Sequence, residues 1–313
     1  MDPQPVVEIS GLIKRFGEIT AVNQLDITVY GGEMFGLVGP DGAGKTTTFR
    51  MLCGIISPTA GTIKILGLDL IKDLRKIVKQ IGYLSQRFSL YGDLTVDENI
   101  EYFAKINDVS DYKEKREELL EFTRLTPFRK RLAEQLSGGM KQKLALACTL
   151  IHRPKVLFLD EPTTGVDPLS RRDFWKILSN ILKEGITIIM STPYLDEAER
   201  CSRVALMNNG SVMVVDIPQN LKNRMKGNVI EIICPEVRKT AAVLKNHPSV
   251  ADVQIFGDRL HVVVNDVQKD LPHLRRYVEE KKIEINDWRT VQASLENVFI
   301  RLLSGKSDRG GVE

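Results

Sequence analysis

The feature that most constrains this chain is a glycine-rich segment, GPDGAGKT, between an apolar run and a stretch typical of a helix. Gly39, Gly44, Lys45 and Thr46 fit the spacing G-x-x-x-x-G-K-[ST] of a phosphate-binding loop. Glycines let backbone N–H groups surround a polyphosphate, and the following helix N-terminus favours the same anion. Lys45 is expected to reach the terminal phosphates, and Thr46 to ligate Mg²⁺. Such a turn can exist without a ligand, but the Lys-Thr pair predicts that this chain binds a nucleoside triphosphate.

Two acidic residues follow another apolar run, VLFL, which is typical of a buried parallel strand. Asp160 at the end of this strand can hold Mg²⁺ through water. Glu161 beside it can orient and deprotonate an attacking water. Adjacent acids can be ordinary surface residues, but their place after a buried strand downstream of a phosphate-binding loop favours catalysis.

A second anion-binding helix start is predicted at Ser137-Gly138-Gly139, because Ser is a favoured N-cap and apolar residues recur after it at helical spacing. A single chain would not need two anion-binding helix N-termini to hold one triphosphate. Two copies that face each other would use both. The pattern therefore predicts that nucleotide binds between two chains.

Two residues carry weaker predictions. Phe16 precedes the Gly17 turn and could stack on an adenine or pack in a hairpin; its position relative to the phosphate-binding loop favours adenine. Gln86 ends a predicted strand and is either ordinary polar surface or an amide that ligates a metal-bound water and senses a neighbouring protein.

Composition fits one large domain followed by a small one, since the chain has 313 residues, 42% of them hydrophobic and 27% charged. A formal net charge of +3 is too small to indicate nucleic-acid binding. The four cysteines show no C-x-x-C spacing, which favours free thiols in a reducing compartment. We see no signal peptide and no run of eighteen apolar residues, and we expect a chain in the cytosol or on the cytosolic face of a membrane.

The motifs GPDGAGKTT, Gln86, LSGGMKQ and VLFLDEP, in this order, resemble the ATP-binding cassette of ABC transporters over about the first 220 residues. LSGGMKQ is the specific part, because a phosphate-binding loop alone occurs in many NTPases. The resemblance implies an α/β P-loop NTPase domain over 1–222, with a helical signature subdomain at about 87–152, and ATP and Mg²⁺ as ligands. Phe16 falls where the family places its adenine-stacking aromatic residue.

The resemblance also assigns roles to single positions. The catalytic residues would be Glu161, Lys45 and Gln86, the metal-binding residues Thr46, Gln86 and Asp160, and the D-loop aspartate Asp167. The ATP-binding loop would consist of Gly39, Pro40, Asp41, Gly42, Ala43, Gly44, Lys45, Thr46 and Thr47. The signature that closes over a partner's nucleotide would consist of Leu136, Ser137, Gly138, Gly139, Met140, Lys141 and Gln142.

One position departs from the family pattern. Pro193 in STPYLDEAE stands where the family has a histidine that contacts the γ-phosphate, and none of the four histidines lies nearby. Proline has neither a side-chain donor nor a backbone N–H. Loss of one preorganised donor can remove on the order of 3 kcal/mol of transition-state stabilisation. We therefore expect slow hydrolysis at this chain's own loop, which favours a heterodimer with a complete cassette over a homodimer.

The pattern restarts near residue 227 and predicts a small α+β domain over 227–304 without a nucleotide motif, followed by a flexible tail, 305–313. IEIND (283–287) is predicted as one of its strands and 294–303 as its last helix. Its three histidines show no metal-binding spacing and are expected to be structural or surface residues.

The segment SLYGDLTVDENI and the closing SLENVFIRLL resemble exporters of the ABC-2 class, including multidrug systems. This implies an ATPase subunit with integral membrane permease subunits and a second cassette as partners. It would lie peripherally on the cytoplasmic face of the membrane, the inner membrane if bacterial. The alternative is a soluble mechanical ATPase of translation or DNA repair, although such proteins usually have tandem cassettes or a coiled-coil insertion, and no nucleic-acid partner is expected.

Overall fold

The computed structural model describes residues 4–86, 90–224 and 228–303, and the chain divides into two compact units, 1–216 and 217–313. This division falls earlier than the boundary near residue 222 expected from the sequence. The reason is that helix α8 (Pro218–Asn223) packs on the last helix, α11 (Leu295–Leu303), and so belongs to the second unit. The predicted tail 305–313 lies outside the described residues.

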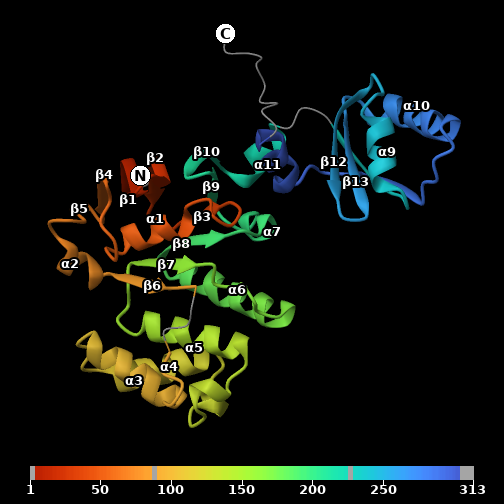
Figure 1. The fold of residues 1–313 in the computed structure, drawn as a ribbon. Helices are drawn as coiled ribbons and strands as arrows, with labels where there is room; N and C mark the ends of the chain where they lie inside the picture. Colours follow the sequence, from red (N-terminus) through yellow and green to blue (C-terminus); the bar gives the residue numbers. More distant parts are fainter. Residues whose placement is uncertain (1–3, 87–89, 225–227, 304–313) are drawn as a thin grey trace. The chain divides into compact units, whose positions relative to one another are not determined.

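A six-stranded sheet forms the centre of the first unit, in the order β10-β9-β3-β8-β7-β6 (Figure 1). Its strands are β3 (Met34–Val38), β6 (Ile81–Leu84), β7 (Val156–Asp160), β8 (Thr187–Thr192), β9 (Arg203–Asn208) and β10 (Ser211–Asp216). All neighbours are parallel except β9 and β10. Every residue of β3, β7 and β8 is buried, as expected for parallel strands covered on both faces.

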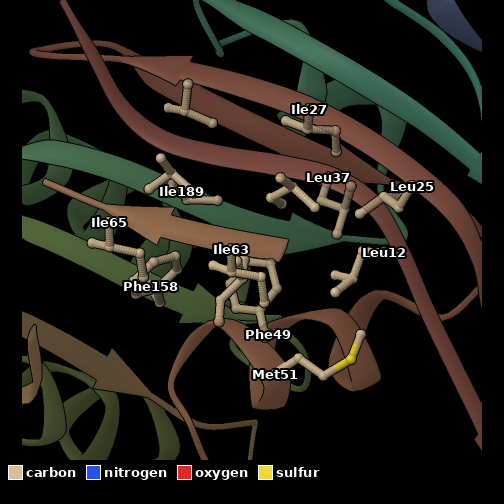
Figure 2. Packing of buried hydrophobic residues seen from close by; sticks show 14 of the residues in the cluster. Leu12, Leu25, Ile27, Leu37, Phe49, Met51, Ile63, Ile65, Phe158 and Ile189 are labelled. Atoms are coloured by element: carbon tan, nitrogen blue, oxygen red, sulfur yellow. The ribbon is translucent and has the colours of Figure 1, made fainter. Parts of the chain in front are cut away.

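An antiparallel four-stranded sheet, in the order β2-β1-β4-β5, completes the β-structure of this unit. Its strands are β1 (Pro5–Phe16), β2 (Ile19–Tyr30), β4 (Ala60–Ile65) and β5 (Leu68–Asp69). Side chains of both sheets and of α1 (Lys45–Leu52) converge on one core (Figure 2). Phe49 of α1 meets Phe158 of β7 edge to face, with 6.0 Å between ring centroids. Burial of such a side chain contributes about 2–3 kcal/mol, so this core holds α1 and the loop before it in place.

A helical subdomain lies between β6 and β7 in the chain, as the sequence predicts. It contains α3 (Val96–Ile106), α4 (Tyr112–Phe122), two short 3₁₀ turns (Thr126–Phe128 and Ala133–Gln135) and α5 (Gly138–Leu150). Their apolar faces form a separate core that includes Ile100, Leu120 and Leu144. Thr95 and Glu98 form a capping box that fixes the start of α3.

Three further helices complete this unit: α2 (Leu74–Val78), α6 (Pro168–Lys183) and α7 (Leu195–Ala198). Helix α2 is short and begins only at Leu74. The Asp69 carboxylate accepts the N–H groups of Ile71 and Lys72, which holds the preceding residues in a turn.

The second unit is an antiparallel sheet in the order β12-β13-β11-β14 covered by helices. Its remaining elements are β11 (Asn228–Ile233), α9 (Val237–Leu244), β12 (Val250–Phe256), β13 (Arg259–Val264), α10 (Val267–Glu280) and β14 (Asp287–Val291). Strands β12 and β13 form a hairpin that turns at Gly257-Asp258. The strand expected at 283–287 is wrong, because pairing begins at Asp287. No helix among the described residues is both long and apolar enough to span a membrane.

Candidate functional site

The phosphate-binding loop runs from the end of β3 to the start of α1, and its glycines are required by space. A Cβ on Gly39 would lie 2.3 Å from the Met207 carbonyl oxygen, closer than any side chain tolerates. Gly44 has a φ of +97°, and its Cβ would lie 2.5 Å from the Ala21 carbonyl oxygen. Backbone this close to a neighbouring strand leaves no room for side chains, so N–H groups define the surface of the loop.

Lys45 is 3% exposed, and its ammonium group is held from three sides. Nζ donates to the carbonyl oxygens of Gly39 (2.8 Å) and Pro40 (3.0 Å) and lies 3.3 Å from Glu161 Oε1. A triphosphate in the loop therefore competes with Glu161 for the same cation. Binding of the anion would release the Glu161 carboxylate for another partner.

Asp160 ends β7 with its carboxylate held by hydroxyl groups. Oδ1 accepts from Ser191 Oγ at 2.6 Å and from Thr46 Oγ1 at 3.2 Å, and Oδ2 lies 3.5 Å from the Tyr83 hydroxyl. Burial, and then the Asp160 charge, raise the pKa of Tyr83, so Tyr83 remains a neutral donor.

Glu161 follows with a left-handed backbone conformation, φ +48°, which is uncommon for a residue with a side chain. Its Oε2 accepts from Gln86 Nε2 at 2.9 Å and from Thr164 Oγ1 at 3.4 Å. The structure thus brings Lys45, Gln86, Asp160 and Glu161 together, as the sequence predicts. Sequence reasoning missed the hydroxyls of Tyr83, Thr164 and Ser191.

Lys45, Gln86 and Glu161 border one open pocket of about 280 Å³. It is lined by Ala21, Asp41, Gly42, Gly44, Lys45, Thr46, Thr47, Gln86 and Glu161. Loop backbone, one ammonium, hydroxyl groups, one amide and two carboxylates make this lining polar. A polyphosphate with a metal ion suits such a lining better than an apolar ligand does.

A magnesium ion fits the chemistry of one end of this pocket. Thr46 Oγ1 and Asp160 Oδ1 approach each other within 3.2 Å, and Mg²⁺ prefers hydroxyl, carboxylate and phosphate oxygens. The described residues contain no cluster of three or more His, Cys, Asp or Glu side chains suited to a metal. Phosphate oxygens and waters would therefore supply the remaining ligands.

Among the described residues, those of the segment Leu136–Gln142 do not line this pocket. Ser137 is the N-cap of α5, as predicted, and its Oγ accepts the Met140 N–H at 3.3 Å. Ser137 and Gly138 are exposed, whereas Gly139 is buried against α6, where a Cβ would lie 2.4 Å from Ser170. The helix start is therefore available to a ligand other than the one in this chain's own loop.

Asp167 caps α6 beside this helix start. Its Oδ1 accepts the N–H groups of Leu169 (3.1 Å) and Ser170 (2.9 Å). Hydrogen bonding by the Ser170 side chain, and then by these N–H groups, lowers the pKa of Asp167. Because Ser170 also packs under Gly139, the aspartate and the start of α5 form one rigid surface.

Phe16 ends β1 and is 50% exposed, with the ammonium group of Lys14 4.9 Å from the ring centroid. It is not among the residues that line the pocket, although Ala21 of the same hairpin is. The exposed ring is free to stack, so adenine contact stays a prediction.

Pro193 follows β8 and is half-buried. The Thr192 carbonyl accepts the Gly39 N–H at 3.3 Å, which ties this segment to the phosphate-binding loop. Thr192 Oγ1 donates to Glu197 Oε2 at 2.7 Å. These hydrogen bonds therefore hold the segment around Pro193 in place, although Pro193 itself has no donor side chain.

Comparison with known proteins agrees with both units. The family model described as "ABC transporter" matches residues 22–164, and the model described as "ATP-binding protein DrrA1-3-like, C-terminal domain" matches 218–303. A probable multidrug ABC transporter ATP-binding protein of Escherichia coli is 42% identical over 308 residues, which are 96% of this chain and 52% of that protein. The chain thus spans about half the length of this relative.

Two other similarities extend over nearly the full length of the relative. A Nod factor export ATP-binding protein of Ralstonia nicotianae is 35% identical over 302 residues, 95% of this chain and 94% of that one. A dimeric ATP-binding cassette solved with ADP and phosphate superposes with a TM-score of 0.61 at 25% identity, over 67% of this chain and 98% of that one.

Proposed function

We propose, from the premise that this chain belongs to the family of ABC transporter ATP-binding proteins, that it binds ATP in the loop pocket and hydrolyses it to power a membrane exporter. The observation that carries the proposal is the convergence of Lys45, Thr46 and Glu161 on one pocket, with Asp160 hydrogen-bonded to Thr46. Loop N–H groups and Lys45 bind the phosphates, and Thr46 and Asp160 hold Mg²⁺. The metal neutralises charge that develops on the phosphates.

Glu161 acts on the attacking water in this proposal. Displacement of its carboxylate from Lys45 by the γ-phosphate frees it to accept a proton from water. Gln86 remains within hydrogen-bond distance of Glu161 Oε2 and can hold that water or the metal's water in line. Breaking the Lys45–Glu161 pair couples phosphate binding to activation of the base.

In this proposal, a second cassette supplies the protein groups that cover the side of the nucleotide facing away from the phosphate-binding loop. The start of α5 and Asp167 form one exposed surface that is absent from the lining of the chain's own pocket. An N-terminal helix end of this kind favours an anion, so it would close over a nucleotide held by a second cassette. The dimeric cassette solved with ADP and phosphate supports this arrangement.

Coupling to export is proposed from the relatives, whose names describe multidrug transport and Nod factor export. The partners would be integral membrane permease subunits, with this chain bound peripherally at the cytoplasmic face. Pro193 favours a second, complete cassette over a second copy of this chain. The export functions in the relatives' names support this proposal over the alternative, a soluble mechanical ATPase. The test is recovery of the tagged chain from detergent-solubilised membranes with an integral membrane protein, rather than with ribosomes or DNA.

Nucleotide-driven association is tested with Glu161→Gln. Loss of the carboxylate stops hydrolysis, so Mg²⁺-ATP should hold the variant in a dimer with twice the 35.3 kDa mass of the chain in size-exclusion chromatography with light scattering. If the partner is a different cassette, the doubled mass appears only with that cassette present.

The matched control is Glu161→Gln combined with Lys45→Ala, which removes the phosphate-binding cation and should remain monomeric. Failure of Glu161→Gln to associate under ATP, both alone and with the cassette recovered from membranes, would contradict the proposal.

A further inference from the structure

We propose that Ser191, at the end of β8, is a positioning residue whose single hydroxyl aligns both acidic residues of the site. This inference rests on the proposed ATP hydrolysis and concerns a residue to which the sequence motifs assign no role. Ser191 is fully buried and lies beside Asp160 in the register of the parallel pair β7–β8.

The direction of each hydrogen bond follows from the chemistry of the partners. Ser191 Oγ lies 2.6 Å from Asp160 Oδ1, and an ionised carboxylate only accepts, so the hydroxyl proton points to Asp160. The Glu161 N–H lies 2.9 Å from the same Oγ and only donates, so it uses a lone pair of the hydroxyl. One hydroxyl therefore fixes the side chain of one acid and the backbone of the next.

The Glu161 backbone needs this support, because φ +48° is a strained conformation for a residue with a side chain. Among the described residues, its N–H donates to Ser191, through Oγ and, at 3.2 Å, through the Ser191 carbonyl oxygen. This conformation places the Glu161 side chain within reach of Lys45 and Gln86.

Of the three hydroxyl groups near Asp160, the one of Ser191 would keep its hydrogen bond when a metal ion binds. Thr46 is a proposed metal ligand, so its hydroxyl would be shared with a bound Mg²⁺, and the Tyr83 contact is long at 3.5 Å. Ser191 does not line the pocket and keeps its bond. It thus holds the Asp160 oxygens in the direction that the metal shell requires.

The test compares Ser191→Ala with Ser191→Thr, and Thr187→Val serves as the matched control. Thr187 is a buried hydroxyl residue at the opposite end of the same strand, where its Oγ1 accepts the Gly32 N–H far along the chain from the acids. Binding of a fluorescent N-methylanthraniloyl ATP is titrated with Mg²⁺ and with EDTA, and turnover is measured alongside.

Ser191→Ala should weaken Mg²⁺-dependent nucleotide binding and lower turnover, each by about tenfold or more, and leave binding in EDTA unchanged. Ser191→Thr should restore both, and Thr187→Val should match the original chain in both. Unchanged Mg²⁺ dependence in Ser191→Ala, or an equal loss in Thr187→Val, would overturn the role of Ser191. Absence of nucleotide binding by the unmodified chain would overturn the proposed function as well, so the two failures are distinguishable.

Discussion

His152 follows α5 and is a half-buried histidine whose protonation should respond to acid. Its Nε2 lies 2.8 Å from the Ile81 carbonyl oxygen, so this nitrogen carries the proton of the neutral ring, and Nδ1 has no partner among the described residues. Burial lowers the pKa of His152 below its usual value of 6.5. The folded chain therefore keeps the ring neutral at a pH where the unfolded chain takes up a proton.

The consequence is a loss of stability in acid. Protons bound preferentially by the unfolded chain reduce the free energy of unfolding as pH falls below about 6.5 and on toward the lowered pKa. In urea unfolding at pH 7.5 and 5.5, His152→Gln should lose less stability between the two pH values than the original chain. His273→Gln, which changes an exposed histidine, should retain the full loss, and an equal loss in both variants would contradict the argument.

Residue types and spacing predicted the polar residues of the pocket but not their supports. Gly44, Lys45 and Glu161 belong to patterns in which each position has one chemical reason. Ser191 and Tyr83 lie in apolar strands, where a hydroxyl has no distinctive spacing. Only the strand order, with β7 between β6 and β8, brings their hydroxyls to Asp160.

The loop before α3 depends on one buried amide, Asn99. Its Nδ2 donates to the carbonyl oxygens of Tyr91, Leu94 and Thr95, and its Oδ1 accepts the Tyr91 N–H. Asn99→Ala removes the acceptor of the Tyr91 N–H and the amide donor shared by the three carbonyl oxygens, which keep only their backbone donors. It should lower the free energy of unfolding by about 1–3 kcal/mol in urea titrations.

A contrasting change on another helix is Ser179→Ala, which removes the hydroxyl of an exposed residue that donates within α6 to the Trp175 carbonyl oxygen. We expect it to alter stability by less than about 0.5 kcal/mol. A comparable cost for both substitutions would show that Asn99 does not organise the loop.

Elements with strong hydrophobic periodicity were predicted well. Errors occurred where backbone pairing between strands did not follow the alternation of side chains. The residues 283–287 alternate as a strand does, and Ile283 is buried as the alternation predicts. Pairing with β11 nevertheless begins only at Asp287, whose neighbours are partly exposed as in an edge strand. Alternation reports which side chains face a core, but not which backbone groups find a partner strand.

At the scale of the whole molecule, the sequence predicted two domains because its motifs stop before a second strand and helix pattern begins. The division after residue 216 could not be predicted, since α8 carries no motif and joins the second unit through its packing on α11. The sequence pattern likewise does not identify the partner subunits. What the chain does contain is an indication of asymmetry, at Pro193.

The asymmetry predicts the kinetics of the chain on its own. The residue before Pro193 is held in place, because the Thr192 carbonyl oxygen accepts the Gly39 N–H of the phosphate-binding loop and the Thr192 hydroxyl donates to Glu197. Pro193→His therefore adds one donor to a site that is otherwise built. Removal of a preorganised donor typically lowers turnover by about 10²–10³-fold. We expect slow ATP turnover by the purified chain and a gain on the order of 10²-fold in Pro193→His, measured as phosphate release.

Pro193→Ala separates the side chain from the backbone, because it restores the N–H that proline lacks without supplying a side-chain donor. It should give no comparable gain. Rapid turnover by the unmodified chain that neither substitution changes would show that this site works without the histidine, and the case for a heterodimer would then disappear. Slow turnover that rises when a complete cassette is added to the unmodified chain would place hydrolysis at the partner's loop, closed by Ser137–Gln142 of this chain.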